Sequence, residues 1–71
     1  MPVREVEARI QAFLASLTPE QRAALEAEAL AGAAAGARAA YEAATGPARR
    51  LLQVGLRDAH LRRLLGLPAA D

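Results

Sequence analysis

The side chains able to act as nucleophiles or as general acids and bases are few and are spaced poorly for catalysis. His60 is the only histidine, and Asp58, two positions away, falls on a different side of a helix. Ser16 is the only serine and stands at an expected helix end, where a local backbone hydrogen bond is its ordinary role. Glu26 and Glu28 are also two apart and diverge. We therefore expect no catalytic residues and no enzymatic activity.

Ligands for a metal or a cofactor are missing from the sequence as well. The chain contains no cysteine, and its histidine belongs to neither a His-x-x-x-His nor a Glu-x-x-His pair. No glycine-rich loop follows a strand, so a nucleotide-binding loop has no structural context. We expect no metal, no cofactor and no small-molecule substrate.

A basic helix face near the C-terminus is the only candidate binding surface. At 100° per residue it combines Arg49, Arg50, Gln53, Arg57 and His60, with Arg63 at its edge. Residues 45–71 carry a net charge of +3, whereas residues 1–44 carry −2. Such a face can neutralise phosphates or bind an acidic partner, but it lacks the aromatic residues that stack on single-stranded bases. A solvated helix face is the ordinary alternative, and the exclusive use of arginine fits GC-rich codon usage as well as phosphate contacts.

The composition favours an all-α fold for the elements that must carry these residues. Twenty of the 71 residues are alanine, only two are aromatic, and β-branched residues are scarce. Apolar spacing and two proline-marked joints predict helices at about 3–16, 19–44 and 47–65 in one small domain, 1–71. We expect a bundle of three helices, or of four if the middle one is broken.

The first two helices have clear sequence signals. A stripe with alternating spacings of three and four predicts the buried side of the first helix and consists of Val3, Val6, Ile10, Phe13, Leu14 and Leu17. Thr18 can cap the second helix, Pro19 can occupy its first turn, and Gln21 stands where a capping box needs Glu or Gln. Leu25 and Leu30 should make the large apolar contacts of that helix.

The alanine-rich run around Gly32 and Gly36 leaves two interpretations. Either one helix continues, bent mildly, with both glycines allowing a close approach, or the glycines bracket a turn and a short helix carries Arg38 to Ala44. We expect continuity slightly more than a break.

The last helix should present a broad apolar arc to the core. That arc contains Leu51, Leu52, Val54, Leu56, Ala59, Leu61 and Leu65. Asp58 and Arg62 fall inside it, one turn apart, and should form an ion pair. Gly66 and Pro68 should end the helix. A wide apolar arc with an ion pair in it is typical of a surface that meets another chain.

Part of the sequence resembles a known family. FLASLTPEQRAALEAEALAGA, followed by Tyr41 and RDAHLRRLLG, is similar to the C-terminal tail of bacterial plasmid replication initiator proteins. The resemblance covers about residues 10–66, without the winged-helix domains that recognise origin DNA in such initiators. It implies association with a replication protein rather than DNA recognition by this chain. The alternative is a general protein-interaction or dimerisation module without a nucleic-acid role.

The expected location of the protein follows from the absence of a membrane-spanning segment and of a signal peptide in the sequence. Its longest runs without a charge, residues 10–19 and Ala29 to Ala37, are shorter than the roughly 20 residues that span a bilayer, and its N-terminus does not resemble a signal peptide. We expect a cytoplasmic protein that binds a protein partner or a second copy of itself, with no membrane contact.

Overall fold

The computed structural model describes residues 2–68, and every regular element in that range is a helix. Helix α1 spans Val3–Ala15, α2 spans Pro19–Ala31, α3 spans Ala35–Ala43 and α4 spans Gly46–Leu65. The all-α prediction is confirmed, with four helices in the described part of the chain.

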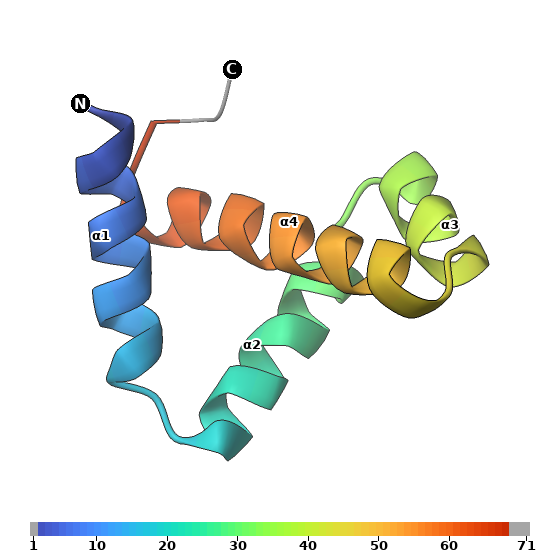
Figure 1. Ribbon diagram of the computed structural model, residues 1–71, viewed down its shortest axis with the longest axis horizontal. Coiled ribbons are helices and arrows are strands. Elements are labelled where there is room, and N and C mark those ends of the chain that lie inside the picture. Colours follow the sequence, from blue (N-terminus) through green and yellow to red (C-terminus); the bar gives the residue numbers. More distant parts are fainter. Residues whose placement is uncertain (1, 69–71) are drawn as a thin grey trace.

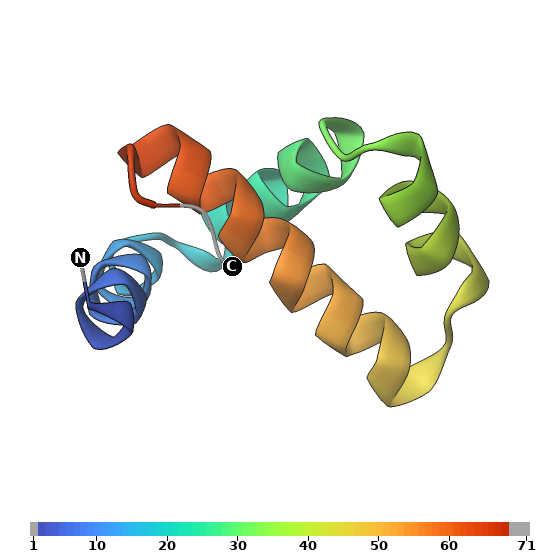
Figure 2. The same cartoon turned by 90° about the horizontal axis from the view of Figure 1, so that it is seen from above.

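The long helix α4 is the element on which the other three helices pack. Figure 1 shows α1 at the C-terminal end of α4, α3 at its N-terminal end, and α2 passing below it. Figure 2 shows that no helix covers the side of the first half of α4 that faces away from α2. The architecture is therefore an open arrangement around one central helix rather than a closed four-helix bundle.

The core lies where α1, α2 and the second half of α4 meet. Its buried residues are Val6, Ile10, Leu14, Leu25, Leu61 and Leu67, with Phe13 and Leu17 packed against them. The predicted stripe of the first helix is thus confirmed, except that Val3 is 69% exposed. Helix α3 contributes no buried residue.

The start of α2 is built as its sequence predicts. The Thr18 hydroxyl accepts a hydrogen bond from the Gln21 amide at 3.1 Å, and the Thr18 amide donates to Oε1 of Gln21 at 2.9 Å. Pro19 opens the helix, where its missing N–H is not needed. The Ser16 hydroxyl donates locally to the Phe13 carbonyl, also as predicted.

The middle segment is broken, so the expectation of a continuous helix is wrong; the turn interpretation is correct about the break, but Gly36 lies inside α3, which begins at Ala35 rather than at Arg38. Helix α2 ends at Ala31, and α3 begins at Ala35 after a short turn. The Arg38 guanidinium donates to the Ala31 carbonyl at 2.7 Å and thereby satisfies an end of α2. A continuous helix would carry Tyr41 about 16 Å beyond Leu30 along the axis. The break instead brings Tyr41 back to a position between α2 and α4.

Gly36 offers a test of the helical conformation at the start of α3. It lies in the first turn of α3 without a positive φ, and a Cβ at this position would meet no atom within 4 Å. We expect Gly36→Ala to stabilise the protein by about 0.5–1 kcal/mol, because alanine loses less backbone entropy on entering the helix. Thermal unfolding followed by circular dichroism should show a melting temperature higher by a few degrees.

Gly66 provides the contrasting variant for that experiment. Its φ is +66°, so Gly66→Ala should lower the melting temperature. A fall for Gly36→Ala of the same size would contradict the helical conformation at Gly36.

Helix α4 ends where the sequence predicts, and the backbone motif at this end also adds a residue to the core. Gly66 takes the left-handed conformation, the Leu67 amide donates to the Arg62 carbonyl at 2.8 Å, and the Gly66 amide donates to the Arg63 carbonyl at 3.4 Å. These two bonds form a Schellman motif, which turns the chain back and buries Leu67. Leu67 is a core residue that helix periodicity alone does not predict.

The predicted inward face of α4 is wrong for Leu51, Leu52 and Val54 in its first half and for Leu65 at its end, all of which are exposed. Leu51 is 73% exposed, Leu52 37% and Val54 38%, whereas Leu61 is fully buried. The reason is that α2 and α3 pack on the side of α4 that carries Gln53 and Leu56. The outer face of α4, defined here as Leu51, Leu52, Val54 and Gly55, is therefore exposed.

Candidate functional site

Three of the five predicted contact residues are engaged within the molecule. Arg49 lies over the ring of Tyr41, with its Cζ 4.5 Å from the ring centroid. Arg57 forms an ion pair with Asp58 at 3.0 Å, and its side chain is only 19% exposed. His60 lies with Nε2 3.7 Å from Oε2 of Glu28 and has an 18% exposed side chain. Arg49 thus links α4 to α3 and Arg57 pairs within α4, whereas His60 lies near Glu28 of α2 without a hydrogen bond at Nε2.

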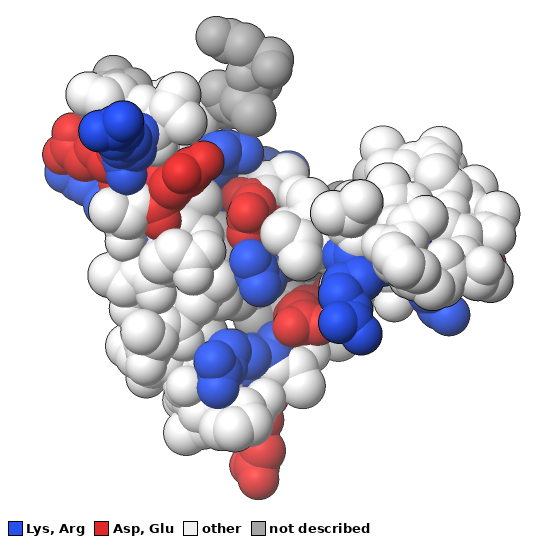
Figure 3. Space-filling view, viewed as in Figure 1, with Lys and Arg blue, Asp and Glu red and all other residues white. Residues whose placement is uncertain are grey.

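The other two predicted contact residues, Arg50 and Arg63, are exposed. Acidic and basic side chains are mixed along the face of the molecule seen in Figure 3, which shows no continuous basic surface. The basic face expected from the helical wheel is thus divided: Arg57 and His60 are partly buried, whereas Arg50, Arg63 and also Arg49, despite its contact with Tyr41, are exposed.

The ion pair expected between Asp58 and Arg62 does not form. Asp58 pairs with its neighbour Arg57, both through Nε and through Nη2 at 3.0 Å. The Nε atom of Arg62 is buried without a hydrogen-bond partner in the described chain. Sequence spacing allowed both pairings, and the surroundings of α4 selected the neighbour.

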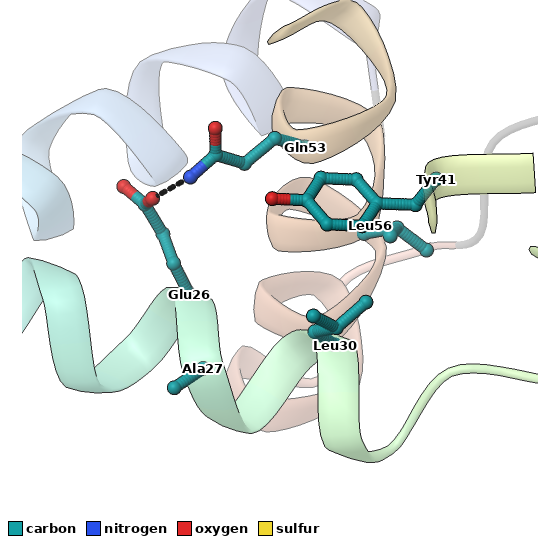
Figure 4. A pocket seen from close by; sticks show the side chains of 6 residues that line it. All are labelled: Glu26, Ala27, Leu30, Tyr41, Gln53 and Leu56. Carbon is teal, nitrogen blue, oxygen red and sulfur yellow. Dashed lines mark hydrogen bonds between the residues drawn. The ribbon is translucent and has the colours of Figure 1, made fainter. Parts of the chain in front are cut away.

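A pocket lies where α2, α3 and α4 meet. Its volume is about 120 Å³, and its walls are formed by Glu26, Ala27, Leu30, Tyr41, Gln53 and Leu56. Figure 4 shows the Tyr41 hydroxyl pointing toward Glu26 and Gln53, with Leu30 and Leu56 beside the ring. The pocket therefore combines an apolar floor with three polar groups at one end, as small-molecule sites do.

The polar end of this pocket is organised around Glu26. The Gln53 amide donates a hydrogen bond to Oε2 of Glu26 and thereby links α4 to α2. Every other glutamate of the chain is exposed, whereas Glu26 is partly buried. No cationic side chain of the described residues pairs with Glu26, because Arg49 is held over the Tyr41 ring.

Sequence reasoning did not bring these pocket residues together. Helical spacing places Gln53 on the polar face of the last helix. Glu26 has only Glu28 as an acidic neighbour two residues away, and the two side chains diverge. The available signal was Tyr41, the one large side chain in a run of alanine and glycine. A residue of this kind has to find a contact outside its own helix, and here it finds α4.

Other kinds of site have little support in the described part of the chain. No group of three His, Cys, Asp or Glu side chains within residues 2–68 is placed to hold a metal ion. None of the helices described is both long and apolar enough to cross a bilayer.

Comparisons with protein-family models, curated proteins and solved structures find no match to this chain. The similarity to replication initiator tails therefore stays a prediction from the residues that carry it.

Proposed function

We propose that this chain is a non-enzymatic helical module that binds proteins through the outer face of α4, with a second copy of itself as the partner. The observation that carries this proposal is the exposure of Leu51 at 73% in the first half of the central helix. Among the described residues, five of the six large apolar ones that are exposed belong to α4. Monomeric proteins rarely leave such a concentration of apolar side chains in solvent.

The total surface of the chain supports a partner of substantial size. The accessible surface is 4958 Å². A folded monomer of 7.4 kDa is expected to expose about 4200 Å². The excess, roughly 760 Å², is close to the roughly 800 Å² that each partner buries in a standard interface.

The position of Gly55 favours a second copy as that partner. It stands at the middle of α4, where it has no positive φ, and a Cβ there would meet nothing within 4 Å. A glycine in a helix interior costs about 1 kcal/mol relative to alanine, and nothing within the chain offsets this. In an antiparallel two-fold pair, Gly55 of each copy lies near the axis and lets the two helices approach closely, with Leu51 and Leu52 on either side.

Sedimentation velocity over a wide range of protein concentration tests this function. We expect the sedimentation coefficient to rise from the monomer to the dimer value in the micromolar range. A single monomeric species up to several hundred micromolar would overturn the proposal.

The second candidate is association with a plasmid replication initiator, with the last helix near nucleic acid. It is supported by the resemblance of residues 10–66 to initiator tails and by the exposure of Arg50 and Arg63. Both candidate functions imply a cytoplasmic location.

Salt-dependent binding to plasmid DNA tests that candidate. We expect binding at low salt to weaken when Arg50 and Arg63 are both replaced by glutamine, because each lost phosphate contact reduces counterion release. Arg4 and Arg22, exposed on α1 and α2, provide the matched double substitution. Equal affinities of the two double variants, or an affinity no better than that of a charge-matched helical peptide, would refute a nucleic-acid role.

A further inference from the structure

We propose that the pocket between α2, α3 and α4 binds a primary ammonium group on a short apolar chain, with Glu26 as the anionic contact. This site goes beyond the self-association of α4, because Gln53 and Leu56 lie on the side of α4 opposite to Leu51. The ligand is bound and not chemically changed.

The charge of the ligand follows from Glu26. A partly buried carboxylate is stabilised by a cation, and the other partly buried acid of the described chain, Asp58, has one in Arg57. Glu26 receives only the neutral Gln53 amide, at Oε2, so Oε1 stays free to accept. The Tyr41 hydroxyl, which points to the same end, has no hydrogen-bond partner in the described residues and supplies a second acceptor. The Tyr41 hydroxyl also carries one proton to donate, but the negative charge of Glu26 stays unpaired, and the free lone pairs at this end suit a cation with several N–H groups, of which an ammonium has three.

The size and shape of the ligand follow from the rest of the pocket. A volume of about 120 Å³ is somewhat below the roughly 150 Å³ of an apolar cavity that binds benzene. Ala27, Leu30 and Leu56 line the pocket away from the carboxylate and suit methylene groups. An ammonium with three or four carbons fits, whether it is a free alkylamine or the end of a lysine side chain on a partner protein.

The experiment is a titration of the ¹⁵N-labelled protein followed by its amide resonances. The probe is n-butylammonium chloride, and n-butanol and sodium butyrate serve as isosteres of different charge. We expect saturable shifts at Ala27, at Gln53 and at the side-chain amide of Gln53, with a dissociation constant of about 1 mM, typical of so small a ligand. Butanol should bind at least about fivefold more weakly, since a hydrogen bond to a charged group is lost.

Two variants tie the binding to the pocket. Glu26→Gln should reduce the affinity for butylammonium to that of butanol, whereas Glu28→Gln, two residues along the same helix, should leave it unchanged. Tyr41→Phe should weaken binding by about threefold, because it removes one acceptor and no charge. Equal shifts with butylammonium and butanol in the unaltered protein, or unaltered binding in Glu26→Gln, would overturn the proposal.

A capped peptide with one central lysine distinguishes the two sources of the ammonium. If the peptide shifts the same resonances and its norleucine analogue does not, the pocket accepts a partner's lysine side chain. If butylammonium binds and the peptide does not, the ligand is a free amine. Sedimentation of Glu26→Gln should show the same concentration dependence as the unaltered protein, so failure of this site and failure of self-association are separately visible.

Discussion

Replacing Leu61 with alanine should lower the free energy of unfolding by about 2–5 kcal/mol. Leu61 is fully buried and is the residue through which α4 joins the core formed by α1 and α2. Removal of its outer carbons leaves a cavity among Ile10, Leu14 and Leu25 that three short helices cannot close without moving. A 71-residue domain has a total stability of only about 4–10 kcal/mol. We therefore expect the Leu61→Ala protein to lose roughly half of its stability.

Chemical denaturation in urea, followed by circular dichroism, measures this effect. The matched variant is Leu64→Ala, because Leu64 lies one turn further along the same helix and is 57% exposed. Its free energy of unfolding should change by no more than about 0.5 kcal/mol. Similar losses for the two leucines would contradict the packing of α4 against α1.

The correctly predicted parts of the fold depend on interactions within a few residues. Thr18 and Gln21 form their capping box because both partners lie within one turn of α2. Gly66 stops α4 because the left-handed conformation is available to glycine at low cost. The buried stripe of α1 is predicted correctly because that helix has a single apolar side, and only this side can pack against the core.

The orientation of α4 was not predictable in the same way. This helix has apolar side chains over more than half of its circumference, so periodicity alone allows several inward faces. The choice between them was made by residues far away in the sequence, Glu26 and Tyr41, which pack on Gln53 and Leu56. Helix geometry alone places Gln53 on a solvent-facing polar surface. In the folded chain this placement is wrong, because Gln53 lines the pocket between α2, α3 and α4.

The break before α3 and the pocket both depend on contacts between helices, which local sequence patterns do not predict. Alanine favours a continuous helix through residues 31–40, and the local preference points that way. The turn at Gly32 lets Arg38 cap α2 and lets Tyr41 reach the space beside Leu30. Contacts between helices thus override helix propensity here, and the pocket exists only because the turn does. The candidate site could be predicted from sequence only after the break was known.

The second prediction with a large effect concerns self-association through the outer face of α4, which the packing of the other helices leaves exposed. Replacing Leu51 with glutamine should weaken self-association at least tenfold, because the side chain would be buried twice in a symmetric pair. Full burial of a leucine side chain contributes about 1.5–3 kcal/mol, and the amide of glutamine would also lose water without a partner. Since Leu51 is 73% exposed in the single chain, the same change should leave the folding of the monomer nearly unaltered.

The matched variant for this experiment is Leu64→Gln. Both positions are exposed leucines of α4, yet they point about 140° apart on the helix, so only Leu51 belongs to the outer face. Sedimentation velocity should show dimer for the unaltered protein and for Leu64→Gln at a concentration where Leu51→Gln is monomeric. If both substitutions weaken association equally, the contact is a general consequence of exposed apolar surface. If only Leu51→Gln does, the pairing is specific to one face of α4, and Gly55→Leu should then abolish it as well, because a bulky side chain at the axis would hold the two helices apart.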